Sequence, residues 1–177
     1  MAIDTGQTLR GALAGAVAAG VWAAQQPLDK RVFGVPYDDT LLLGKLVTRR
    51  TAPAYVIGTA MHLANGALFG AVYANVAPRL PLPSWARGPA AAMAENFGTW
   101  PLAAVSDRLH PAREDLPRLS GNRAALAQAT WRHLLFGVVL GELERRLSDP
   151  AEDEVPAYEH VISSNGHGSI ENAVRAS

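Results

Sequence analysis

The stretch that decides the fold runs from Pro53 to Pro78 and reads PAYVIGTAMHLANGALFGAVYANVAP. It contains no formally charged side chain, and His62 is the one group in it that titrates near neutral pH. A helix needs roughly 20 apolar residues to cross the hydrocarbon core of a bilayer, which is about 30 Å thick. The first expectation is therefore a helix that spans a membrane.

Three weaker stretches of similar length accompany this run. With it they predict helices at about 8–28, 53–78, 87–107 and 122–146, and Pro101 predicts a kink in the third. Short links between these segments predict an all-α fold, a four-helix transmembrane bundle within residues 1–147. The alternative for the first segment is a signal peptide, because Arg10 precedes an alanine-rich run, although Asp4 weakens its basic start.

Composition excludes several classes of function without settling the solvent. The 177 residues include 16 basic and 16 acidic side chains, so no net field attracts nucleic acid. The absence of cysteine excludes disulfides, iron–sulfur clusters and Cys-ligated zinc. The hydrophobic share of 49% is ordinary for a globular protein, but much of it is alanine and glycine, which let helices approach closely in lipid.

The segment between the first two helices, YDDTLLLGKLVTRR, predicts a short helix at about 38–50 that lies in the membrane interface. The alternative is a surface helix that covers the core of a soluble bundle. We interpret Asp38 and Asp39 as its N-terminus. Residues 148–177 are acidic and rich in Ser, Asn and Gly, and we expect a disordered tail in which His160 and His167 are solvated.

An internal repeat is the second organising pattern. Gly20-Val21-Trp22 recurs as Gly98-Thr99-Trp100, and Leu68-Phe69-Gly70 recurs as Leu135-Phe136-Gly137. The first helix therefore pairs with the third, and the second with the fourth. Two helical hairpins that arose by duplication would produce this pattern, with both entering the membrane from the same side.

Ionisable residues within the predicted spans are the candidate site. Helix geometry places them at similar depths, in a buried polar layer near the centre of the bundle that consists of His62, Glu95, Arg132 and His133. Glu95 with Arg132 is the expected pair, because a charge in a membrane needs a partner. The layer is either a proton relay or ligand site, or a structural pin that fixes the helix register. Further hydrogen-bonding candidates are Asn65, Asn96 and Gln128.

Other motifs give little chemistry. Gly11 and Gly15 form a small-xxx-small motif that predicts close helix packing. No dinucleotide fingerprint, phosphate loop or HExxH motif is present, so the sequence predicts no cofactor, no metal site and no enzymatic activity.

The segments QQPLDKRVFG, ENFGTWPLAAVSDRLHPA and QATWRHLLFGVVLGELERRL resemble the YagU-like small bacterial inner-membrane proteins, whose function is unknown. The resemblance covers residues 8–147 in organisation and brings no catalytic residues. It implies a helical, multi-pass protein of the bacterial cytoplasmic membrane. The excess of basic residues in the loops 29–52 and 107–123 predicts that these face the cytoplasm and that both termini lie outside.

Three functional hypotheses follow. The first is a non-enzymatic protein of the lipid bilayer, in stress tolerance or partner binding, with a homo-oligomer as a candidate assembly. The second is a minimal transporter or proton-coupled channel that uses the buried polar layer. The third is a soluble helical bundle that binds an apolar ligand. Nucleic acid is not an expected partner.

Overall fold

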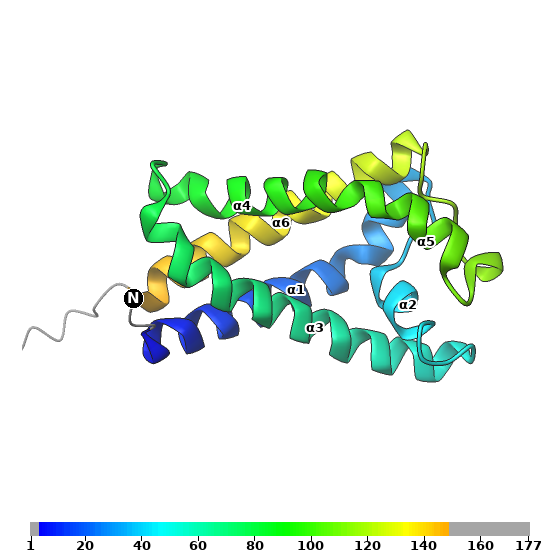
Figure 1. Ribbon diagram of the computed structural model, residues 1–177, viewed down its shortest axis with the longest axis horizontal. Coiled ribbons are helices and arrows are strands. Elements are labelled where there is room, and N and C mark those ends of the chain that lie inside the picture. Colours follow the sequence, from blue (N-terminus) through cyan, green and yellow to red (C-terminus); the bar gives the residue numbers. More distant parts are fainter. Residues whose placement is uncertain (1–3, 149–177) are drawn as a thin grey trace, which may run out of the picture.

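The protein folds into a bundle of long helices. The computed structural model describes residues 4–148, and every regular element within them is helical. The elements in chain order are α1 (Thr5–Phe33), α2 (Asp39–Gly44), α3 (Thr51–Val76), η1 (Ala77–Arg79), α4 (Ser84–Thr99), η2 (Trp100–Leu102), α5 (Ala103–Leu109), η3 (Arg113–Asp115) and α6 (Arg123–Ser148). The prediction of an all-α helical bundle is confirmed. Figure 1 shows α1, α3, α4 and α6 extended along the same long axis.

The first helix continues past its predicted end at Leu28. Pro27 lies inside α1, which stops only at Gly34, whose φ of 68° is the left-handed conformation typical of a helix C-cap. Lys30 and Arg31 in the last turn suit the negative end of the helix dipole. The extension matters because it carries Asp29 into the interior of the bundle.

The third predicted helix, 87–107, is two helices in the structure. α4 ends at Thr99, the 3-10 turn η2 contains Pro101, and α5 continues from Ala103. Proline has no backbone N–H to donate and its ring crowds the preceding turn, so an α-helix does not continue unbroken through this position. The break falls at the proline where a kink was predicted.

The predicted interfacial helix at 38–50 is shorter than expected. α2 ends at Gly44, and Leu46 and Val47 lie beyond it with exposed side chains. α2 packs against α3 so closely that a β-carbon added at Gly58 would lie 1.7 Å from the carbonyl oxygen of Thr40. The helix is therefore part of the bundle at one end of the molecule, as Figure 1 shows.

Glycines bring the backbones of α1 and α3 into contact. A β-carbon added at Gly15 would lie 2.0 Å from the carbonyl oxygen of Gly66, and one at Gly70 would lie 2.1 Å from that of Gly11. Real β-carbons do not approach so closely, so these positions accept only glycine without a shift of the helices. The structure thus places Gly11 and Gly15 in the contact between α1 and α3.

The contact between α4 and α6 is built in the same way. A β-carbon added at Gly88 would lie 2.2 Å from the carbonyl oxygen of Gly137, and Gly141 lies next to the same position. Gly70 meets Gly11 in one hairpin as Gly137 meets Gly88 in the other. Both hairpins therefore depend on direct contact between helix backbones.

The two hairpins join along one side only. α1 packs against both α3 and α6, and α4 packs against α6, whereas α3 and α4 are not closely packed against each other. At the end that holds α2, His110 Nε2 lies 2.9 Å from the carbonyl oxygen of Leu42, and Lys45 Nζ lies 3.0 Å from a carboxylate oxygen of Asp115. These contacts hold the two hairpins together at the end that carries α2, whereas α3 and α4 are not closely packed along the open side of the bundle.

Many large apolar side chains lie outside the core of this bundle, a pattern that we call inverted burial. The main core cluster combines alanines such as Ala14, Ala18 and Ala92 with a few large side chains, which are Trp22, Tyr73, Phe136 and Leu140. Many large apolar side chains are instead exposed, including Leu9, Leu13, Val56, Leu68, Trp85, Phe97 and Val138. These statements about buried and exposed side chains apply to residues 4–148.

Among the described residues, one helical segment, Thr51–Arg79, is long and apolar enough to cross a membrane, and 22% of its most apolar window is buried. The four membrane spans predicted from the sequence are thus not all supported by length and composition. The predicted tail, 148–177, with His160 and His167, lies outside the described residues except for Ser148, which ends α6.

Candidate functional site

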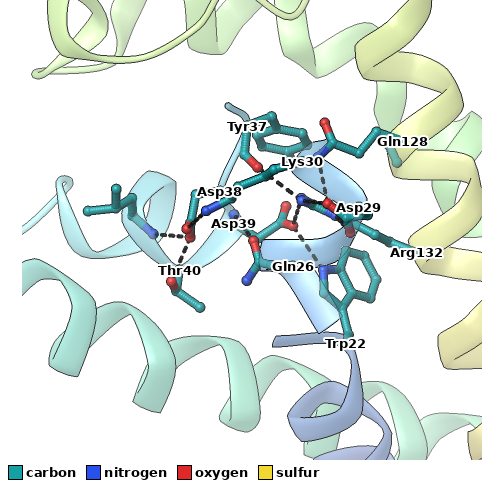
Figure 2. Close-up of polar contacts among 12 residues, drawn as sticks. Trp22, Gln26, Asp29, Lys30, Tyr37, Asp38, Asp39, Thr40, Gln128 and Arg132 are labelled. Atoms are coloured by element: carbon teal, nitrogen blue, oxygen red, sulfur yellow. Dashed lines mark hydrogen bonds and ion pairs between the residues drawn. The ribbon is translucent and has the colours of Figure 1, made fainter. Parts of the chain in front are cut away.

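A buried arginine holds two aspartates at the end of the bundle that carries α2. Arg132 on α6 is fully buried, and its Nε and Nη2 each lie 2.6 Å from a carboxylate oxygen of Asp29. Its Nη1 donates to Asp39 Oδ2 at 2.6 Å, and Nη2 also donates to the carbonyl oxygen of Tyr37 at 2.9 Å. Figure 2 shows these contacts converging on the guanidinium group. The planar fork of arginine suits such paired recognition.

Neighbouring side chains complete this group, which we name the Arg132 cluster. Trp22 Nε1 donates to Asp39 Oδ2 at 2.9 Å, and Gln128 Nε2 donates to Asp29 Oδ1 at 2.7 Å. Its members are Trp22, Gln26, Asp29, Tyr37, Asp39, Gln128 and Arg132. One guanidinium faces two carboxylates, so the cluster retains a net negative charge.

The fold brings these residues together by reversing the chain after α1. Asp29 lies in the last turns of α1, the left-handed Gly34 ends the helix, and Asp39 begins α2. Asp39 N donates to Gln26 Oε1 at 3.1 Å, which ties the start of α2 back to α1. Arg132 then joins α6 to both sides of the reversal.

Asp38 fastens the same loop from outside the cluster. Its Oδ1 accepts hydrogen bonds from Thr40 Oγ1 at 2.6 Å and from the backbone N of Leu41 at 3.0 Å, and it pairs with Lys30. Burial opposes the charged form of this carboxyl, but the hydrogen bonds from Lys30, Thr40 and Leu41 outweigh it and lower the pKa of Asp38. The charged form is therefore part of the folded structure.

A cleft of about 470 Å³ lies beside the cluster, on the open side between α3 and α4. Apolar side chains from α3 and α6, Leu68, Phe69, Val72 and Phe136, form much of its wall. Leu68 and Val72 are more than half exposed, which places them toward the mouth. The volume lies within the range of about 300–1,000 Å³ that is usual for small-molecule sites.

Polar side chains also line this cleft. His133 Nε2 lies 2.6 Å from Glu95 Oε2, and His133 Nδ1 lies 2.7 Å from the carbonyl oxygen of Ala129. Both neighbours are hydrogen-bond acceptors. His62 is only 8% exposed, and its Nε2 has no hydrogen-bond partner. The Trp22 ring lies edge-on to both imidazoles, at centroid distances of 5.2 Å from His62 and 4.6 Å from His133.

The structure brings three of the four predicted layer residues to one cleft, which His62, Glu95 and His133 line. Arg132 is not among the lining residues and belongs to the neighbouring cluster. The predicted pairing of Glu95 with Arg132 is wrong, because Glu95 pairs with His133 and Arg132 with two aspartates. Adjacent residues on a helix point about 100° apart, so Arg132 and His133 face different neighbours.

The further hydrogen-bonding candidates separate in the same way. Gln128 belongs to the Arg132 cluster, Asn65 lines the cleft with an exposed side chain, and Asn96 is buried, with its Nδ2 donating to Thr130 Oγ1 at 3.2 Å. Within residues 4–148, no three His, Asp or Glu side chains gather in a way that could hold a metal ion.

Sequence reasoning missed Asp29 and Asp39, the two carboxylates that hold Arg132. Asp29 directly follows Leu28, where the uncharged run and the predicted helix end, and the sequence analysis interprets Asp39 as part of a helix N-terminus. The sequence does carry a later stop signal, since Gly34 follows Lys30 and Arg31, and it places Asp29 within the helix.

Comparisons of this chain with protein-family models, with curated proteins and with solved structures find no match.

Proposed function

We propose that this chain is a small polytopic integral membrane protein without enzymatic chemistry, and that its role is to bind a small amphiphilic molecule in the cleft between α3 and α4. The observation that carries the proposal is the inverted burial: many large apolar side chains are exposed, while alanines and the fully buried Arg132 lie inside. A water-soluble monomer rarely exposes large contiguous apolar surface, whereas lipid accommodates it.

The packing inside the bundle supports a lipid environment. Lipid tails are as apolar as leucine, so helices in a bilayer associate through close contact of small residues and through hydrogen bonds. The glycine contacts of α1 with α3 and of α4 with α6 are of this kind. The Arg132 cluster is the internal pairing expected of charges within a membrane protein.

The helix lengths support several crossings. At about 1.5 Å per residue, a 29-residue α1 is about 44 Å long, and 26-residue α3 and α6 are each about 39 Å long. Each exceeds the hydrocarbon core of about 30 Å. The proposal places α1, α3, α4 with α5, and α6 across the bilayer, as two hairpins that arose by duplication.

The resemblance to YagU-like proteins supports a setting in the bacterial cytoplasmic membrane. The basic residues of the end that holds α2 and α5 favour the cytoplasm for that end, with both termini outside. A homo-oligomer is part of the proposal only as a candidate assembly through the exposed apolar faces.

The cleft supports a binding role. Its apolar wall reaches the mouth at Leu68 and Val72, and the imidazoles of His62 and His133 are more deeply buried. An amphiphile with its chain toward the mouth and its polar group inside would match both regions. Because the mouth lies between α3 and α4, such a molecule could enter sideways from the bilayer.

Single-cysteine labelling tests the membrane setting, because the chain contains no native cysteine. Val17→Cys and Val138→Cys place a thiol on outer faces that are 46% and 50% exposed, and Ser120→Cys places one in an exposed loop. In opened vesicles, we expect a membrane-impermeant maleimide to modify Ser120→Cys and to spare the other two until detergent is added. Equal labelling of all three before detergent would contradict the proposal.

A carbonate wash separates the remaining alternative. Recovery of the chain in the alkaline supernatant would favour a soluble bundle that binds an apolar ligand. Recovery in the pellet would agree with the membrane setting.

A second candidate function is proton-coupled transport. The observation that favours it is the Glu95–His133 pair, in which Glu95 is 39% exposed, together with His62 Nε2, which has no hydrogen-bond partner in the same cleft. In liposomes, Glu95→Gln and His62→Leu would abolish pH-dependent flux and leave thermal stability unchanged if the cleft transports. A loss of stability alone would show that these residues are structural.

A further inference from the structure

We propose that the molecule bound in the cleft carries a protonated amine as its polar group, held by the Glu95 and Asp39 carboxylates and by His62 Nε2, with an apolar chain along the α3 wall. This inference rests on the proposed function, because it names the ligand class of the same cleft.

The charge lining the cleft is negative. Asp39 and Glu95 line it, and no lysine or arginine does so among the described residues. Glu95 pairs with His133, whereas Asp39 shares the single guanidinium of Arg132 with Asp29, so carboxylates outnumber the cations beside the cleft. The nearest guanidinium, Arg132, is fully buried, and its Nε, Nη1 and Nη2 already donate to Asp29, Asp39 and a carbonyl oxygen. An anionic group would therefore find carboxylates and no free cation, whereas an ammonium group would reduce the excess negative charge.

His62 supplies an acceptor that nothing in the described structure uses. The ring is nine-tenths buried and lines the cleft, and its Nε2 has no hydrogen-bond partner. In a neutral imidazole, one ring nitrogen donates a hydrogen bond and the other accepts one. A buried acceptor without a partner is unfavourable, so a ligand N–H at this position would remove a standing cost.

The aromatic residues favour the same class of ligand. Trp22 and Phe136 lie at the inner end of the cleft with ring centroids 6.1 Å apart, and Phe69 continues the wall with its centroid 5.4 Å from that of Phe136. Aromatic faces attract cations and also pack against alkyl chains. A carboxylic acid or phosphate head would gain neither the ring contacts nor the carboxylate pairing.

Binding of three octyl compounds of equal chain length to the full chain tests the charge preference. We expect octylammonium to bind the protein in phosphatidylcholine nanodiscs, 1-octanol to bind at least tenfold more weakly, and octanoate to bind most weakly of the three. Isothermal titration gives the affinities after subtraction of empty nanodiscs. The zwitterionic lipid avoids concentrating either ion at the bilayer surface.

Two variants locate the effect in the cleft. Glu95→Gln should weaken octylammonium binding at least tenfold and leave octanol binding unchanged. Asn65→Lys introduces an ammonium group at an exposed lining position, so it should abolish octylammonium binding and strengthen octanoate binding. Glu142→Gln removes a carboxylate that lies on α6 outside the cleft and should change none of the three affinities. Because Asn65 is exposed, Asn65→Lys keeps the test decisive if Glu95→Gln does not fold.

The outcomes separate this inference from the function beneath it. Equal binding of octylammonium and octanol, or an octylammonium affinity unaffected by both Glu95→Gln and Asn65→Lys, would overturn the amine assignment and leave an amphiphile site in place. Absence of binding by all three compounds would overturn the amine assignment and the proposed cleft function together.

Discussion

Arg132 is the residue on which the interior depends most. Its guanidinium group is fully buried and pairs with one carboxylate from α1 and one from α2. Arg132→Met would leave Asp29 and Asp39 buried without a cation, and removal of one partner from a buried pair typically costs about 3–5 kcal/mol. We expect a loss of this size in the free energy of unfolding, measured by denaturant titration in detergent micelles.

The matched control is Arg146→Met on the same helix. Arg146 pairs with Glu142 at 2.6 Å, but its side chain is 69% exposed. Exposed pairs contribute about 0–1 kcal/mol, so this variant should unfold close to the wild type. Equal losses in the two variants would show that burial of the Arg132 cluster does not set its contribution.

Asp38 makes stability depend on pH in the acid range. Burial opposes its charge, yet its hydrogen bonds with Lys30, Thr40 and Leu41 lower the pKa of Asp38 below the unfolded value of about 3.9. A carboxyl whose pKa is lower in the folded state stabilises the protein above its unfolded pKa, and this contribution disappears as the pH falls through the folded pKa. Asp38→Asn should therefore be less stable than the wild type by about 2 kcal/mol near pH 6, where it lacks hydrogen bonds to a charged group.

Thermal unfolding of the two proteins between pH 2 and 6 gives the measurement. The difference between them should shrink below about pH 4. Glu114→Gln, at a side chain that is 82% exposed, serves as the control and should show no such trend. A gap between wild type and Asp38→Asn that stays constant with pH would contradict the assignment.

For single residues, the sequence predicts the depth of a side chain along the bundle better than it predicts which residue that side chain pairs with. Helix geometry places His62, Glu95 and His133 at comparable depths, and they line one cleft. It does not predict that Arg132 turns toward α1, because that direction depends on how α6 is rotated and on where the loop after Gly34 returns. Tertiary packing sets the rotation of α6 and the path of this loop, and neither can be predicted from the uncharged run.

At the scale of elements, the glycines that join α1 to α3 have a measurable role. Gly15→Ala would place a β-carbon 2.0 Å from the carbonyl oxygen of Gly66, so the two helices must separate. We expect a loss of about 1–3 kcal/mol in the free energy of unfolding, as is typical of overpacking. Denaturant titration in detergent micelles measures this free energy of unfolding.

Gly20→Ala on the same helix is the contrasting change. Its β-carbon would lie 3.7 Å from Leu63 Cδ2, an ordinary contact. Alanine is favoured over glycine in a helix by about 1 kcal/mol, so this variant should be as stable as the wild type or more so. If both alanines prove neutral, backbone contact between α1 and α3 is not what holds the hairpin.

Elements could be predicted from the sequence where the local signal is strong. The uncharged run around His62 forms α3, Pro101 interrupts the third rod, and Asp38 caps α2. The bounds that failed involve competing signals. The uncharged run predicts that the first helix ends at Leu28, but the left-handed Gly34 ends α1. The segment at 38–50 predicts a longer helix, but α2 stops at Gly44 and packs against α3.

At the scale of the whole molecule, the inverted burial predicts how the outer surface tolerates charge. Val138→Lys places a lysine on an outer face near the middle of α6. A lysine at the centre of a membrane helix costs about 2.5–3.5 kcal/mol on insertion scales. We expect less of this variant in the carbonate-resistant membrane fraction, measured by quantitative immunoblot against the wild type.

The loop variant Ser120→Lys should be recovered as the wild type is, because that position is exposed between helices. On the surface of a soluble protein, both changes would fall within about 0.5 kcal/mol of neutral. Equal recovery of the two variants would therefore count against the proposed bilayer setting.

The partners in the Arg132 cluster are synthesised at different times. Asp29 leaves the ribosome 103 positions before the arginine that neutralises it, and Asp39 leaves 93 positions before it. Until α6 is synthesised, Asp29 and Asp39 have no arginine to pair with. We therefore expect this part of the first hairpin to remain in contact with water. A chain that ends at Gly121 is expected to be degraded rapidly in pulse-chase experiments, and co-expression of residues 122–177 as a separate polypeptide is expected to protect it. We therefore expect the first hairpin to reach its final position only after α6 has been synthesised and packed against it.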